Sequence, residues 1–161
     1  MKTISVVTPC FNEEGNVREV YERVRDLMSS LGRYRYEHIF IDNASRDATF
    51  AVLSELAAAD ANVKVIRNAR NFGHVRSPMH ALLQTCGDAV IILMSDLQDP
   101  PEVLAQLLEQ WEKGIPAQGY VDEFLREIDI SIVIDSDFSD HVARSARSDH
   151  FGPQSNPWKL A

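Results

Sequence analysis

The chain has 161 residues, 45% of them hydrophobic, which is enough to form one domain around a buried core. Its formal net charge of −8 at pH 7 argues against binding nucleic acid or an anionic membrane through overall charge. An anionic ligand would therefore need a positive charge supplied locally. We expect no nucleic-acid partner.

The two cysteines, Cys10 and Cys86, lack the spacing of a metal site or a disulfide framework, which fits two reduced thiols in a reducing compartment. No basic and apolar leader opens the chain, and no apolar run approaches the roughly 20 residues of a membrane-spanning helix. We therefore predict a chain without a secretion signal or a transmembrane segment.

Segments typical of strands and helices alternate along the first 114 residues. Short apolar or β-branched runs predict strands over 3–8, 38–42, 63–67 and 89–93. Helical spacing of apolar residues predicts helices over 16–32, 47–60, 77–87 and 101–114. This alternation predicts an α/β fold with a Rossmann-like, mainly parallel sheet flanked by helices.

The loops that follow the predicted strands are the expected place for chemistry. Ligands of parallel α/β sheets bind outside the carboxyl ends of the strands, where these loops meet. The four loops are richer in polar and turn-forming residues than the strands before them: 9–15, 43–47, 68–76 and 94–101.

The fourth loop, MSDLQDPP, offers two oxygen ligands just past a strand end. A carboxylate at Asp96 and an amide at Gln98 suit Mg²⁺ or Mn²⁺, with water and ligand phosphates completing the coordination. The alternative makes Asp96 a solvated turn residue, and Asp99 fits well as the cap of the helix that starts near Pro101. Because that alternative leaves Gln98 unexplained, we predict a metal site formed by Asp96 and Gln98.

A second acidic pair competes for the metal. A strand predicted over 130–134 is followed by Asp135 and Asp137, whose spacing is equally suitable for a divalent ion. No clear helix follows this pair, so no anchored cleft is expected around it. We therefore interpret it as a solvated acidic loop.

The first and second loops carry candidate contacts to a nucleoside. Asp42 and Asn43 lie at a strand end, where their side chains can hydrogen bond to the edge of a base, and Ser45 or Asp47 would cap the next helix. In the first loop, Phe11 either stacks on a base or packs beneath the loop. Glu13 lies near a helix start, where an acid is favoured in any case.

The third loop is basic. It offers four residues that either balance phosphate charge at the mouth of the site or are simply exposed: Arg67, Arg70, His74 and Arg76. The sequence alone leaves both interpretations open.

The chain resembles family 2 glycosyltransferases, in particular polyprenyl-phosphate sugar transferases similar to dolichol-phosphate mannose synthase. The matching motifs are TPCFNEEGNV (8–17), IDNASRDAT (41–49), RNFG (70–73), GDAVII (87–92) and SDLQDPPE (95–102). Their order along the chain makes the set specific. The motifs cover residues 1 to about 114, which correspond to the nucleotide-binding half of the family's GT-A fold.

The resemblance implies a metal-assisted glycosyltransferase. It would transfer a sugar from a UDP- or GDP-linked donor to a polyprenyl phosphate or another acceptor, in the cytoplasm or at the cytoplasmic face of the membrane. The resemblance assigns Asp96 and Gln98 to the divalent metal. It assigns five residues to the nucleotide-sugar site: Pro9, Phe11, Glu13, Asp42 and Asn43.

Two positions depart from the family pattern. Met94 stands where the family often has an acid, two residues before the position of Asp96. Asn43 stands where the usual DDGS motif has its second acid, because this chain reads DNAS. The first departure is expected to weaken contacts to the ribose or the metal.

The segment 115–161 matches nothing that we recognise in the family. We predict two parts: a nucleotide-sugar-binding domain over 1–114 and an irregular, partly disordered appendage over 115–161. The change after residue 114 predicts a truncation or a change of reading frame, which would remove the acceptor half and the general base. The catalytic residues are therefore not assigned. The alternative function is a non-catalytic remnant that binds nucleotide and metal without transfer.

Overall fold

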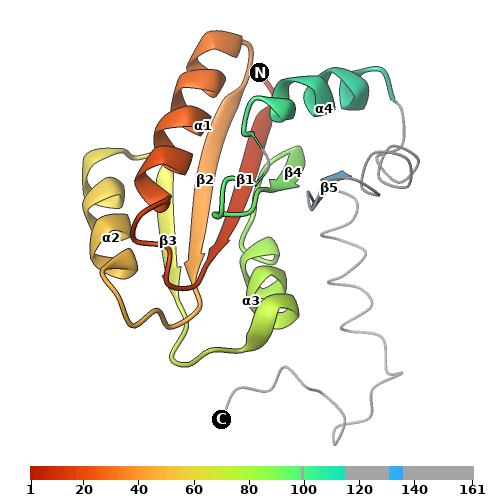
Figure 1. Ribbon diagram of the computed structural model, residues 1–161. Coiled ribbons are helices and arrows are strands. Elements are labelled where there is room, and N and C mark those ends of the chain that lie inside the picture. The colour runs from red at the N-terminus through yellow and green to blue at the C-terminus, as the bar shows by residue number, and fades with distance from the viewer. Residues whose placement is uncertain (99, 115–130, 136–161) are drawn as a thin grey trace, which may run out of the picture.

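The computed structural model describes residues 1–98, residues 100–114 and the backbone of 131–135. A five-stranded sheet has the order β3-β2-β1-β4-β5 (Figure 1). Its strands are β1 (Thr3–Cys10), β2 (Arg35–Asp42), β3 (Val63–Arg67), β4 (Ala89–Ile92) and β5 (Ser131–Asp135). β1 to β4 are mutually parallel, and β5 pairs with β4 in the antiparallel direction.

Helices cover both faces of the sheet. They are α1 (Val17–Leu31), α2 (Thr49–Ala59), α3 (Gly73–Leu82) and α4 (Val103–Glu112). Buried residues of α1, α2 and α4 share one hydrophobic cluster, and α3 contributes Ala81 and Leu82 to a second cluster on the other face. This arrangement confirms the predicted α/β fold.

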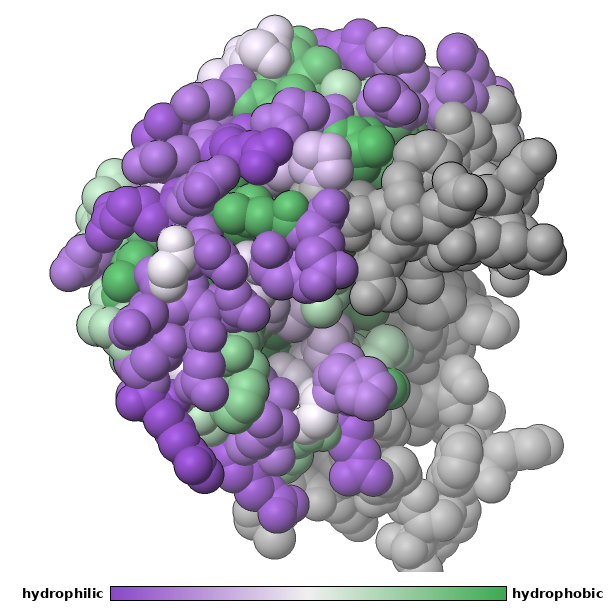
Figure 2. Space-filling model, viewed as in Figure 1, coloured by the Kyte–Doolittle hydropathy of each residue, from purple (hydrophilic) through white to green (hydrophobic). Residues whose placement is uncertain are grey.

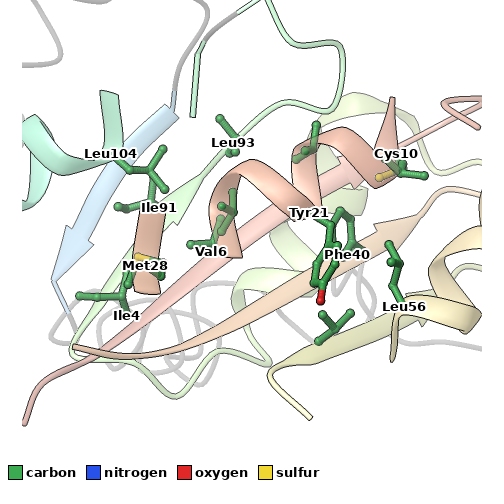
Figure 3. Close-up of a cluster of buried hydrophobic side chains, with 14 of the residues drawn as sticks. Ile4, Val6, Cys10, Tyr21, Met28, Phe40, Leu56, Ile91, Leu93 and Leu104 are labelled. Atoms are coloured by element: carbon green, nitrogen blue, oxygen red, sulfur yellow. The ribbon is translucent and has the colours of Figure 1, made fainter. Parts of the chain in front are cut away.

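The central strands carry apolar side chains on both faces, as expected for parallel strands between helices. In β1, Ile4 and Val6 belong to the larger cluster and Val7 to the smaller one. Figure 3 shows Met28 of α1 in the larger cluster with Ile4 and Val6. Because successive side chains of a strand point to opposite faces, each central strand contributes to the hydrophobic packing on both sides of the sheet.

The face shown in Figure 2 is mostly polar where its residues are described. On the face seen in Figure 2, hydrophilic residues predominate and hydrophobic ones form separate patches. Within the described ranges, no helix combines the length and the apolar character that crossing a membrane requires.

Helix α3 begins earlier than the sequence predicted. We expected it over 77–87, but it starts at Gly73 and contains Pro78. The backbone N–H of Gly73 donates to Asn71 Oδ1 at 2.8 Å, which satisfies a donor at the new start. A tertiary hydrogen-bond network around Asn71, rather than local propensity, therefore sets this boundary.

The strand expected at 130–134 is present as β5, and its register bears on the competing metal site. Asp135 pairs with Ala89, the first residue of β4. Asp135 thus lies at the edge of the sheet opposite the carboxyl ends of the parallel strands. Asp99 and Asp137 lie outside the described residues, as does most of the expected appendage.

Candidate functional site

The loops after β1, β2 and β4 share one edge of the sheet. Cys10 pairs with Asp42, and Asp42 pairs with Arg67, so the ends of β1, β2 and β3 are level. In the described residues, the non-glycine residues with positive φ are Asn12, Ala44 and Leu97, and each lies in one of these three loops. A left-handed conformation costs about 1 kcal/mol or more at such residues and is concentrated at functional sites.

Hydrogen bonds join the loop after β1 to the loop after β2. The N–H of Asn12 donates to Ser45 Oγ at 2.9 Å, and the N–H of Arg46 donates back to Asn12 Oδ1 at 2.9 Å. The N–H of Glu13 donates to Thr49 Oγ1 at 2.8 Å. These bonds hold the loop after β1 and the loop after β2 in a fixed position relative to each other.

The loop after β4 is tied to the first loop. Ser95 Oγ donates to the carbonyl of Pro9 at 3.0 Å, which brings the predicted metal loop beside the predicted nucleotide loop. Asp96 and Gln98 are both exposed, and the N–H of Gln98 donates to Asp96 Oδ1 at 3.2 Å. Among the described residues, Asp96 Oδ2 accepts no hydrogen bond.

Asp96 and Gln98 offer oxygen atoms of the kind that a hard divalent ion binds, and such an ion would take its other ligands from elsewhere. Within the described residues, no group of three or more His, Cys, Asp or Glu side chains could enclose a metal. Mg²⁺ commonly uses one or two protein oxygens and completes its octahedron with water and phosphate. A metal held by Asp96 and Gln98 together with a diphosphate stays a prediction.

Asp42 is a buried acid with one oxygen hydrogen bonded and the other in an ion pair with Arg67. Its side chain is fully buried, and Oδ1 accepts a hydrogen bond from the N–H of Ser45 at 2.9 Å. Oδ2 has no hydrogen-bond partner among the described residues, and Arg67 Nε lies 3.5 Å away. A buried carboxylate normally uses all of its acceptor capacity, so Oδ2 is a candidate for accepting a hydrogen bond from a ligand.

The other predicted nucleotide residues lie around Asp42. Phe11 is 43% exposed, so it does not pack beneath the loop. Glu13 accepts a hydrogen bond from Asn16 Nδ2 at 2.8 Å through Oε2. Pro9 is the penultimate residue of β1, beside the end of β2. These contacts place the predicted set on two neighbouring strands and their loops, and direct contact with a nucleotide stays a prediction.

Asn43 is already fully hydrogen bonded inside the protein. Its amide nitrogen donates to Asn71 Oδ1 at 3.0 Å and to the carbonyl of Gly73 at 3.2 Å. Its amide oxygen accepts from Asn68 Nδ2 at 3.0 Å and from the N–H of Phe72 at 2.9 Å. A contact with a nucleoside would have to compete with one of these bonds.

Cys10 lies beneath the site and is not a nucleophile. Cys10 is 2% exposed, and burial raises the pKa of its thiol against a weaker lowering by Ser95, with small further increases from the negative charges of Glu13 and Asp42. The thiol is therefore protonated at neutral pH and acts as a core residue.

The basic third loop belongs to a longer segment without acids. No Asp or Glu occurs between Asp60 and Asp88, whereas that stretch contains four basic residues, Lys64, Arg67, Arg70 and Arg76. Arg70 and Arg76 are exposed and form no ion pair with any described residue. This segment supplies local positive charge beside the site in an otherwise acidic protein.

Sequence reasoning missed the residues that hold the loops together. Asn68, Asn71 and Ser95 each bridge two loops by hydrogen bonds, yet each resembles an ordinary turn residue in the sequence. A usable signal was the pair of asparagines in NARN, directly after a predicted strand.

Comparison with known proteins shows the family to which the chain belongs. The family model described as "Glycosyl transferase family 2" matches residues 5–141. The chain belongs to this family. The match continues past residue 114 and includes β5, although the boundary between two domains at residue 114 stays a prediction.

Relatives of this family 2 chain include the bactoprenol glucosyl transferase of Shigella phage SfX. The two are 41% identical over 111 residues, which are 69% of this chain and 36% of the phage protein. The undecaprenyl-phosphate 4-deoxy-4-formamido-L-arabinose transferase of Klebsiella pneumoniae is 36% identical over 123 residues, 75% of this chain and 37% of that protein. This chain spans about a third of the length of these curated relatives.

A solved structure supports the family fold. The mannosyltransferase PcManGT from Pyrobaculum calidifontis, in complex with GDP-Man and Mn2+, matches with a TM-score of 0.51 at 20% identity. The match covers 58% of this chain and 27% of that one. At this level of identity the likeness shows a shared fold.

Proposed function

We propose that this chain is the donor-binding part of a metal-assisted glycosyltransferase. It binds a UDP- or GDP-linked sugar, and the reaction transfers the sugar to a polyprenyl phosphate. The observation that carries the proposal is the convergence of Asp42 and Asp96 on one edge of the sheet, in a chain that belongs to glycosyl transferase family 2.

The residues of this edge have separable tasks. Phe11 presents an exposed ring for stacking, and buried Asp42 accepts a hydrogen bond from a base N–H through Oδ2. Pro9 and Glu13 line the base and ribose pocket. Asp96 and Gln98 hold the divalent ion, which when bound offsets negative charge on the leaving diphosphate.

The donor and acceptor classes rest on the relatives. Two relatives are named for bactoprenol and undecaprenyl phosphate, and the PcManGT structure holds GDP-Man and Mn2+. In the transfer, the bond between the sugar and the donor diphosphate breaks, and a bond to an acceptor oxygen forms. With such an acceptor, we expect the reaction at the cytoplasmic face of the membrane.

The metal assignment predicts a specific binding defect. Asp96→Ala should weaken binding of UDP or GDP in the presence of Mn²⁺ by at least about tenfold, because a metal–oxygen ligand is lost. Binding without metal should change little. Isothermal titration calorimetry with and without Mn²⁺ measures both values.

Asp135→Ala is the matched control, because Asp135 lies at the opposite edge of the sheet. It should leave metal-linked binding unchanged. Loss of that binding in Asp135→Ala, with normal binding in Asp96→Ala, would reverse the assignment.

Transfer itself is tested with radiolabelled UDP- and GDP-sugars and polyprenyl phosphate. Label in the lipid fraction supports an active enzyme. Metal-linked nucleotide binding without transfer supports the alternative, a remnant that binds and does not react. Absence of both binding and transfer would overturn the proposed function.

A further inference from the structure

We propose that Asn43 is a positioning residue whose amide fixes the 68–73 loop against the end of β2 and thereby shapes the donor pocket. This inference rests on the proposed function. It differs from the expectation of direct nucleoside contact, because it gives Asn43 a task that its four existing hydrogen bonds already perform.

The bonds of Asn43 reach most of the loop. They engage the side chains of Asn68 and Asn71 and the backbone of Phe72 and Gly73. Asn43 is only 6% exposed, so these bonds are shielded from water. A shielded network of this kind orders a loop more strongly than exposed bonds do.

The network also links the loop to its two neighbouring elements. Asn68 donates from its backbone N–H to the carbonyl of Asp42 at 2.9 Å, and its Nδ2 donates to Ser77 Oγ of α3 at 2.9 Å. Asp42 is the buried acid of the site. Through these bonds, Asn43 and Asn68 connect the end of β2 at Asp42 to the first residues of α3.

An amide, and not an acid, is required at residue 43 in this loop. Asn71 Oδ1 and the carbonyl of Gly73 are both acceptors, and both receive hydrogens from Asn43 Nδ2. A carboxylate would place a negative oxygen against these acceptors and has no hydrogen to donate. This requirement explains why the chain has DNAS where an acid was expected at the second position.

The first test follows the loop without any ligand. Residue-level hydrogen exchange should show the protection factor of the Phe72 amide falling about tenfold in Asn43→Asp at pH 7. The carboxylate can still accept from the Phe72 N–H, but the two bonds that Asn43 Nδ2 donates to Asn71 and Gly73 are lost, so the loop opens more often. At lower pH the introduced carboxylic acid is protonated and can donate one hydrogen bond, so part of the protection should return. Asn43→Ala should lose protection at both pH values.

Gln84→Glu is the matched control. It makes the same amide-to-acid change at an exposed position in the same acid-free segment, and its side chain makes no hydrogen bond to a described residue. It should leave the Phe72 amide protected at both pH values. Unchanged protection of Phe72 in Asn43→Asp at pH 7 would overturn the network.

The second test asks whether the loop shapes the pocket. Calorimetry with UDP and GDP in Mn²⁺ should show about tenfold weaker binding by Asn43→Asp at pH 7 and recovery at lower pH, relative to Gln84→Glu under the same conditions. If the Asn43 variants fail to fold, Asn71→Ala provides the test, because it leaves buried Asn43 in place. It should weaken binding in the same direction.

Lost protection with unchanged nucleotide affinity would overturn the positioning role and leave Asn43 purely structural. A wild-type chain that binds neither nucleotide would overturn the proposed function and the pocket role with it. In that case the exchange result still decides whether Asn43 orders the loop, so the two failures are distinguishable.

Discussion

Lowering the pH from 6.5 to 4.5 is expected to reduce the free energy of unfolding by about 2 kcal/mol, because His38 must remain neutral in the folded protein. His38 is completely buried in β2. Burial lowers its pKa to about 3, against a weaker opposing effect of Asp60. Since the folded pKa lies below the unfolded one, this stability is present above pH 6.5 and is lost as the pH falls.

The surroundings of His38 explain why a charge is not accommodated. Nε2 is 2.9 Å from Thr8 Oγ1, whereas Nδ1 has no hydrogen-bond partner among the described residues. The ring lies against Phe40, with 4.0 Å between centroids. A proton on Nδ1 would therefore place an unpaired charge in an apolar layer.

Urea unfolding at several pH values measures this effect. Glu37, Asp47 and Glu102 have lowered pKa values, so the stability that they contribute is lost mainly below about pH 4.5 and adds only a small part to the change in the chosen window. His38→Gln should remove most of the dependence between pH 6.5 and 4.5, and His80→Gln, at an exposed position, should keep it. A wild-type stability that is flat over this window would contradict the buried neutral histidine.

Gly87→Ala is expected to destabilise the protein by about 3 kcal/mol, because no space exists for a methyl group beside β1. The added Cβ would lie 2.6 Å from Ser5 Oγ, 2.7 Å from Ser5 N and 2.9 Å from the carbonyl oxygen of Ala89. Two of these atoms are backbone, so the strands themselves would have to move apart.

Gly15→Ala provides the control, since nothing lies within 4 Å of its added Cβ. Its unfolding free energy should stay within about 0.5 kcal/mol of the wild-type value. Urea denaturation at neutral pH compares the variants. Equal stability of Gly87→Ala and wild type would show that the approach of the 86–88 segment to β1 is looser than the structure describes.

The close approach at Gly87 belongs to a polar network at the end of the sheet away from the site. Gly87 N–H donates to Ser5 Oγ at 2.9 Å, and Ser5 Oγ donates to the carboxylate of Glu37. Lys64 pairs with the same carboxylate. This network fixes the start of β4, and β4 in turn carries the loop with Asp96.

Several elements were predictable because their signals are local. The run 63–67 is a strand with the predicted bounds, since apolar and β-branched residues between turn formers leave few alternatives. Helix α1 follows the spacing of Val17, Val20 and Val24, all fully buried. The position of the polar loops at the carboxyl edge followed from the alternation of strands and helices.

Other features depend on partners far away in the chain. The start of α3 moved to Gly73 because Asn71 is fixed by Asn43, 28 residues earlier. The role of Asn43 could not be read from its type, because an exposed asparagine and a buried one with four partners look identical in the sequence. Likewise, only the pairing of β5 with β4 separates Asp135 from the site.

The sequence by itself determined the α/β class, the four polar loops and the resemblance to family 2 glycosyltransferases, because hydrophobic periodicity and short motifs are properties of neighbouring residues. Only the tertiary structure decided which loops touch, that Asn43 holds the 68–73 loop, and that buried Asp42 has one oxygen without a hydrogen bond from the described residues. These features arise from hydrogen bonds between distant segments, and such bonds form only once the sheet has brought the strand ends together.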